Sequence, residues 1–156
     1  LIHAVASLRT FKSVKRRMQN IFAGRVFNKH VTVYDDFAHH PTAIEQTLNG
    51  LRDNVGDDTL LAVLEPRSNT MKQGVHKHLV SDALGQADLS LSYASDDVQW
   101  DVKELETENI LTFRDVDQLL SILVTKIKES DRDCNVLIMS NGAFAGLYSK
   151  LIEKLS

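Results

Sequence analysis

The residues most able to do chemistry lie in three polar stretches, each directly after an apolar run typical of a buried strand. These stretches are residues 35–42, 65–72 and 140–146. In an open parallel sheet, ligands bind beyond the carboxyl ends of the strands. We therefore expect the three stretches to converge on one edge of a sheet and to form a single ligand site there.

The first stretch pairs two carboxylates with two imidazoles. A carboxylate at a strand end, such as that of Asp36, can accept hydrogen bonds from the hydroxyls of a nucleotide ribose. His39 and His40 could donate to a phosphate or a carboxylate, or bind a metal. Alternatively, Asp35 or Asp36 simply caps the turn before Pro41. The residues alone leave both interpretations open.

The second stretch offers cations. The planar guanidinium of Arg67, directly after a buried strand, suits bidentate capture of a carboxylate or a phosphate. A solvated loop arginine is the alternative. Lys72 could also serve an anion, or it could lie on the surface of the helix that follows.

The third stretch is a glycine-containing turn from a strand to a helix. Backbone N–H groups at such a helix start can face an anion. With Gly146 as the last glycine of a G-x-G-x-x-G motif, Asn141 and Ala143 occupy the other two glycine positions, so the motif is absent, as is a G-x-x-x-x-G-K-[ST] phosphate loop. Close packing of helix on sheet explains Gly142 and Gly146 equally well.

Other candidate residues carry weaker signals. His76 and His78 resemble a metal pair, but residues two apart on a helix do not face each other, so we expect both at the surface. Cys134 precedes a buried strand and is expected at the edge of the core. A basic cluster, which is either solvated or reaches a polyphosphate held by another domain, precedes the first strands. Its members are Lys12, Lys15, Arg16 and Arg17.

The elements that position these residues follow from hydrophobic periodicity. Continuous apolar runs predict buried strands at 59–64, 135–139 and 31–34, with weaker candidates at 89–93 and 110–113. Helical spacing predicts helices at 41–51, 74–84, 116–127 and 147–155. A hairpin of 19–27 and 30–34 around Asn28-Lys29 should add an antiparallel edge strand. The predicted fold is α/β: a Rossmann-like open sheet, mostly parallel, with helices on both faces.

Composition narrows the class of protein. The 156 residues suit one domain, and 43% hydrophobic with 25% charged residues excludes disordered and fibrous classes. No apolar run approaches the roughly 18 residues that cross a membrane, and no signal peptide opens the chain. The lone Cys134 fits a reducing compartment, so we expect a cytoplasmic protein. A net charge of −3 argues against nucleic acid as a partner.

The three stretches together resemble the C-terminal domain of the Mur ligases. The motifs are VYDDFAHHPTAI at 33–44, LEPRSNTMK at 64–72 and MSNGAFAG at 139–146. Among Mur ligases, PRSNTMK is most similar to the members that join UDP-N-acetylmuramate to the tripeptide L-alanyl-γ-D-glutamyl-meso-diaminopimelate in peptidoglycan recycling. The resemblance covers essentially the whole chain.

The resemblance implies that residues 1–156 are the last of three domains. The others hold the UDP-sugar and, in a central ATPase domain, the phosphate loop and most ligands of Mg²⁺. Residues 1–17 are then a linker or helix from that central domain, which agrees with a start at Leu1 that looks like mid-helix. The implied partners are the two substrates and the other two domains of the same chain. We expect no metal site within these residues and no ligation by them alone.

Family roles carried over for ATP concern three residues. In the family, ATP phosphorylates the lactoyl carboxylate of the sugar, and the amine of the peptide attacks the acyl phosphate. The resemblance implies that Asp36 holds the ribose of ATP and that Arg17 faces its phosphates. It also implies that His39 is catalytic and approaches either the reacting centre or the peptide.

The remaining roles concern the incoming peptide. The resemblance implies that Arg67 faces the peptide, with Ser140 and Asn141 lining its far end. The sister ligase for free L-alanine has a further arginine in the Arg67 loop, which grips the carboxylate of the amino acid. This sequence lacks it, and in the tripeptide that carboxyl is a neutral amide, beside which an unpaired cation would be costly. The alternatives are an L-alanine ligase domain or a free-standing nucleotide- or peptide-binding module.

Overall fold

A single sheet organises the part of the chain described by the computed structural model, residues 16–67, 69–75 and 77–156. The order of its strands is β1-β2-β6-β3-β4-β5. Their bounds are β1 (Gln19–Val26), β2 (Lys29–Asp36), β3 (Thr59–Leu64), β4 (Leu89–Tyr93), β5 (Ile110–Phe113) and β6 (Cys134–Met139). β1 pairs antiparallel with β2, and all other neighbours are parallel. The predicted mostly parallel sheet with an antiparallel edge strand is confirmed.

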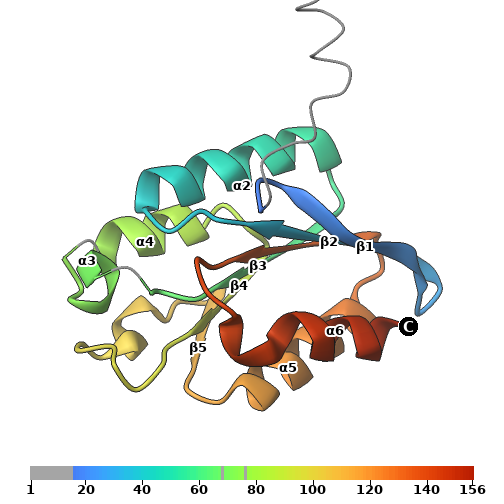
Figure 1. Cartoon of the computed structure of the whole chain (residues 1–156). Coiled ribbons are helices and arrows are strands. Elements are labelled where there is room, and N and C mark those ends of the chain that lie inside the picture. Colours follow the sequence, from blue (N-terminus) through green and yellow to red (C-terminus); the bar gives the residue numbers. More distant parts are fainter. Residues whose placement is uncertain (1–15, 68, 76) are drawn as a thin grey trace, which may run out of the picture.

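Helices cover both faces of the sheet (Figure 1). On one face lie α2 (Pro41–Val55) and α4 (Lys77–Leu84), and on the other lie α5 (Val116–Glu129) and α6 (Leu147–Leu155). Three shorter helices complete the described elements: α3 (Asn69–Lys72), η1 (Val102–Leu105) and η2 (Phe144–Gly146). No helix in the described ranges has the length and apolar character needed to span a bilayer.

The central strands are buried on both faces, as their unbroken apolar runs predict. In β3, the side chains of Leu60, Ala62 and Leu64 join a core with α2 and α4. Those of Leu61 and Val63 join a second core with α5 and α6. Successive side chains of a strand point to opposite faces, so a six-residue apolar strand serves both cores at once.

The turn of the hairpin lies one residue earlier than predicted. Val26 pairs with Lys29, which leaves Phe27 and Asn28 as the two turn residues, in place of Asn28-Lys29. Both have positive φ, 51° and 64°. A two-residue turn with positive φ at both positions matches the right-handed twist of the strands.

The predicted helix at 74–84 is shorter than expected. Residues 69–72 form the separate helix α3, and α4 begins only at Lys77. Gly74, with φ of +71°, ends α3 in the left-handed conformation that favours glycine. A Cβ at Gly74 would lie 2.9 Å from the Trp100 ring, so glycine is also needed there for space. His76, one of the two histidines of the metal-pair candidate, lies outside the described residues, and His78 is exposed on α4.

Candidate functional site

The carboxyl ends of β2, β6 and β3 lie side by side at the same level. Asp36 pairs with Met139, and Met139 pairs with Leu64. The ladder extends one step further, because the N–H of Ser140 donates to the carbonyl of Asp36 over 3.2 Å and the N–H of Glu65 donates to that of Met139 over 3.0 Å. The predicted convergence of the three polar stretches at one edge of the sheet is confirmed.

Asp35 and Asp36 are the last two residues of β2, and not the first residues after it. Adjacent strand residues point to opposite faces, and both carboxylates are buried. The Asp36 carboxylate accepts the N–H of Met18 on Oδ2 and that of Ala38 on Oδ1, each over 2.8 Å. It therefore binds the start of the described chain to the turn before α2. Its proposed contact with ribose stays a prediction.

Asp35 belongs to a hydrogen-bonded group on the other face, which we name the Arg16 anchor: Arg16, Asp35 and Tyr148. Arg16 Nε lies 3.0 Å from Asp35 Oδ2, and the Tyr148 hydroxyl donates to Asp35 Oδ1 over 2.8 Å. Arg16 Nη2 also donates to the Tyr148 hydroxyl over 2.8 Å and to the carbonyl of Ser140 over 2.7 Å. The anchor joins the start of the described chain to β2, to the turn after β6 and to α6.

The electrostatics of the anchor keep the Tyr148 phenol neutral and the Arg16 guanidinium charged. Burial, the hydrogen bond to Asp35 and the charge of Asp35 raise the pKa of Tyr148 far above its ordinary value, so the phenol stays protonated. Burial alone would lower the pKa of Arg16, but its hydrogen bond to Asp35 and its interactions with Tyr148 outweigh burial and raise it. The guanidinium also lies over the Tyr148 ring, 5.7 Å from its centroid.

The basic cluster predicted before the hairpin is divided by the structure. Arg16 turns inward to the anchor, whereas the neighbouring Arg17 is exposed. Lys12 and Lys15 lie outside the described residues. Arg17 thus offers an exposed guanidinium beside the carboxyl end of β2, where Asp36 binds the N–H of Met18.

The two histidines of the first stretch have different surroundings. His39 is half-buried, and its Nδ1 lies 2.9 Å from the carbonyl of Phe37. A carbonyl only accepts, so Nδ1 carries a proton and, in the neutral ring, the lone pair is on Nε2. The edge of the ring contacts Phe37, with centroids 5.1 Å apart. His40 is exposed and immediately precedes α2, with Pro41 in the first turn.

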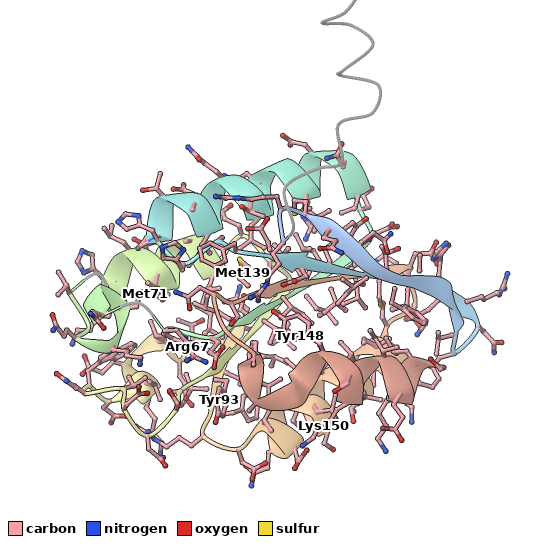
Figure 2. The ribbon with its side chains drawn as sticks, viewed as in Figure 1. Arg67, Met71, Tyr93, Met139, Tyr148 and Lys150 are labelled. Carbon is pink, nitrogen blue, oxygen red and sulfur yellow. The ribbon has the colours of Figure 1, made fainter. Side chains whose placement is uncertain are left out.

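Arg67, labelled in Figure 2, lies over the turn after β6, where its guanidinium is close to Gly142. Its Nη1 lies 3.7 Å from Oε1 of Glu65, whose side chain is buried, while Arg67 itself remains 43% exposed. The hydroxyl of Ser140 donates to Oε2 of Glu65 over 2.5 Å and accepts the N–H of Gly142 over 2.9 Å. One buried carboxylate therefore contacts both the guanidinium of Arg67 and the hydroxyl that shapes the turn.

The residues predicted to face the peptide differ in how deeply they are buried. Ser140 is fully buried, whereas Asn141 is half-exposed. Lys72, the other candidate cation, forms an ion pair with Asp97.

Cys134 is buried at the start of β6, as expected. In the described ranges no group of three or more His, Cys, Asp or Glu side chains could hold a metal ion.

Sequence reasoning missed the contacts of four residues that shape this edge: Arg16, Asp35, Glu65 and Tyr148. Arg16 was expected only as a member of the basic cluster and Asp35 only as a possible turn cap, and Glu65 and Tyr148 were given no role. A usable signal existed for Asp35, because it shares the face of Val31 and Val33 on a strand and a carboxylate on a core face requires a partner. The partner could not be found from the sequence, since Tyr148 lies 113 residues away.

Comparisons with known proteins agree with this architecture. Residues 16–142 match the family described as "Mur ligase, glutamate ligase domain". The chain is 42% identical over 156 residues to the UDP-N-acetylmuramate–L-alanyl-γ-D-glutamyl-meso-2,6-diaminoheptandioate ligase of Haemophilus influenzae, covering 97% of this chain and 33% of that protein. The Escherichia coli protein of the same name is 40% identical over 157 residues, covering 98% of this chain and 33% of that protein.

Solved structures show the same fold. A murein peptide ligase from Psychrobacter arcticus superposes with a TM-score of 0.78 at 35% identity, covering 97% of this chain and 32% of that one. A domain of a related putative ligase from Haemophilus ducreyi, solved by itself, gives a TM-score of 0.68 at 38% identity, covering 90% of this chain and all of that one. This chain thus spans about a third of the curated relatives' length. It belongs to the Mur ligase family and corresponds to the family's C-terminal domain.

Proposed function

We propose that this chain is the C-terminal domain of an ATP-dependent ligase that joins UDP-N-acetylmuramate to L-alanyl-γ-D-glutamyl-meso-diaminopimelate. The observation that carries the proposal is the meeting of three polar stretches at the ends of β2, β6 and β3. That edge presents the exposed guanidiniums of Arg17 and Arg67, which suit the anionic groups of a nucleotide and a peptide.

The choice of a tripeptide rests on the loop that follows β3. Its exposed cation is Arg67, with Glu65 directly beneath, and no second arginine occurs between 65 and 72. A free amino acid would bring a carboxylate that needs such a second cation, whereas the first residue of a tripeptide brings a neutral amide. The two relatives that are at least 40% identical over nearly the whole of this chain carry the tripeptide in their names.

Residues at the β2 end would serve the nucleotide. Arg17 would face the phosphates of ATP, and a remaining lone pair of the Asp36 carboxylate would accept a ribose hydroxyl. ATP, when bound, supplies the phosphoryl group that activates the lactoyl carboxylate of the sugar as an acyl phosphate. His39 would lie close to the reacting centre, where its imidazole, oriented by the carbonyl of Phe37, would serve proton transfer.

Residues at the β3 and β6 ends would serve the peptide. Arg67 would bind a carboxylate of the peptide, and Asn141 would line its far end. Ser140 would act from beneath, because its hydroxyl already joins Glu65 to the N–H of Gly142. The role of this edge is to position two reactants and to neutralise their charge, which supplies much of the rate enhancement in such reactions.

The rest of the active site would come from two further domains. We propose that residues 1–17 link this domain to a central domain, which holds the phosphate loop and most Mg²⁺ ligands. The 156-residue chain alone should then release no ADP when it is mixed with ATP, UDP-N-acetylmuramate and tripeptide. ATP-dependent ligation by the chain alone would refute the proposal that other domains complete the active site.

Substrate competition in an intact ligase that contains this chain tests the substrate assignment. With UDP-N-acetylmuramate and ATP fixed, tripeptide and free L-alanine are offered together at equal concentration, and the two products are separated by mass. We expect the tripeptide product to predominate. Predominance of the L-alanine product would identify the domain as that of an L-alanine ligase. If neither substrate reacts although the protein is correctly folded, the result would favour a binding module.

A further inference from the structure

We propose that the Arg16 anchor positions Arg17 for the phosphates of ATP, so that Arg16 is a positioning residue of the ligase. This inference rests on the proposed function, because it takes the nucleotide role of Arg17 from there. It assigns distinct tasks to two adjacent arginines of one basic cluster: one is fixed inside the domain, and the other is directed outward by it.

The first argument is the number of elements that one guanidinium joins. Arg16 contacts Asp35 on β2, the carbonyl of Ser140 after β6 and the hydroxyl of Tyr148 on α6. A guanidinium is planar, with its N–H groups in fixed directions, so three partners in different elements fix its position and orientation. A solvated arginine would make no such set of contacts.

The second argument is the backbone on both sides of Arg17. The carbonyl of Arg16 accepts the N–H of Phe37 over 2.8 Å, and the N–H of Met18 donates to Asp36 over 2.8 Å. Arg16 and Met18 both have positive φ, 61° and 45°. Residues other than glycine hold this conformation only where their surroundings impose it. Arg17 is therefore an exposed residue between two fixed neighbours.

The third argument is charge. The positive charge of Arg16 is paired with Asp35, and the Tyr148 hydroxyl donates to the same carboxylate. The anchor is therefore internally neutral and has no need of an anion from outside. Arg17, in contrast, is exposed and presents its charge at the surface.

Hydrogen exchange on the 156-residue chain tests the anchor by itself. Tyr148→Phe removes one hydroxyl and keeps the ring, and Arg16→Lys keeps the charge but cannot make the three contacts. We expect either variant to speed exchange of the Phe37 and Met18 amides by about tenfold or more while the β6 amides keep their protection. Lys150→Met is the control, since it removes an exposed ion pair with Asp117 from the same helix. Unchanged exchange of the Phe37 and Met18 amides in both variants would refute the claim that the Arg16 anchor fixes the backbone around Arg17.

A double-mutant cycle in the intact ligase tests the positioning role. Arg17→Gln alone should raise KM for ATP by about tenfold, with little effect on KM for tripeptide, as expected for one charge-assisted contact. Arg16→Lys should raise KM for ATP in the wild-type background, but add almost nothing in the Arg17→Gln background, because its effect passes through residue 17. Additive effects of the two substitutions would overturn the proposal.

The two experiments separate failure of this inference from failure of the proposed function. A normal KM for ATP in Arg17→Gln, together with faster amide exchange in the anchor variants, would refute the nucleotide role of Arg17 and leave the anchor a purely structural feature. Normal exchange in the anchor variants, together with a raised KM in Arg17→Gln, would refute the anchor and retain the nucleotide role.

Discussion

At the scale of single residues, the position of Arg67 depends on the absence of a side chain at Gly142. A Cβ built at Gly142 would lie 2.3 Å from Nη1 and 2.6 Å from Cζ of Arg67. The backbone of Gly142 is not in the left-handed region, so alanine would be acceptable there except for this contact. The glycine is needed because the guanidinium lies directly on the turn.

Gly142→Ala should therefore displace Arg67 and leave the fold intact. In the intact ligase we expect kcat/KM for tripeptide to fall by about tenfold or more, equivalent to about 1.4 kcal/mol. Gly50→Ala is the matched control, since Gly50 lies in α2 with nothing within 4 Å of a Cβ; it should keep wild-type kinetics and stabilise the helix by about 0.5–1 kcal/mol. Steady-state kinetics and thermal unfolding check both variants. Normal kinetics for Gly142→Ala would show that the guanidinium is not needed where it lies.

The sequence allowed the place of the site to be predicted better than its internal contacts. Asp36, His39 and Arg67 could be placed at one edge because each follows or ends an apolar strand run. The pairing of Asp35 with Tyr148 could not be predicted, since such a contact depends on how α6 is set against β2. The depth of a residue such as Ser140 likewise depends on the turn around it, which its residue type does not reveal.

At the scale of elements, the hairpin and α5 are joined by Lys29. Its Nζ donates to the carbonyl of Ile127 over 2.8 Å, to that of Lys128 over 2.9 Å and also to that of Ser130. The last carbonyls of a helix have no partner within the helix and carry its negative dipole end. A cation from the start of β2 therefore satisfies the end of α5.

Lys29→Met should loosen this junction. We expect the free energy of unfolding to fall by about 1–2 kcal/mol, from the loss of charge-assisted hydrogen bonds at a helix end. Urea denaturation followed by circular dichroism measures it. Lys126→Met, which removes an exposed pair with Glu129 on the same helix, should change the free energy by less than about 0.5 kcal/mol. Equal effects of the two substitutions would contradict a capping role for Lys29.

Element types could be predicted well, and element ends less so. The apolar runs at 59–64 and 135–139 predicted strands buried on both faces, and β3 and β6 are such strands. The predicted start of α4 was three residues too early, because helical periodicity does not reveal that Gly74 adopts a positive φ next to Trp100. The hairpin turn was displaced by one residue for a similar reason: Phe27, an unusual turn residue, adopts a positive φ that its type does not suggest.

At the scale of the whole molecule, Tyr148 links stability to pH. Its pKa is raised, first by burial and then by Asp35, above the ordinary value of 10.0, so the folded chain holds this proton more tightly than the unfolded chain. The stabilisation is complete below about pH 10 and is lost as the pH rises further, because the unfolded state then releases the proton and the folded state does not.

The comparison of the wild-type chain with Tyr148→Phe isolates this effect. We expect the difference in their free energies of unfolding to shrink, or change sign, as the pH rises from about 9 to about 11. Urea titrations at each pH measure it, and the other tyrosines cancel because both proteins contain them. A difference that stays constant over this range would show that burial and Asp35 do not hold the phenol in its neutral form.

The attachment of residues 16–18 to the end of β2 has a mechanical consequence. A body that turns about a fixed point moves least near that point, and the binding of Met18 by Asp36 places such a point at the site itself. The Phe27–Asn28 turn lies at the opposite end of β2, about 25 Å away for a strand of this length (Figure 1). If the domain rotates about residues 16–18, the hairpin tip is displaced furthest, while Asp36 and its neighbours mainly change their orientation. Such a rotation changes the direction in which the site faces more than its position.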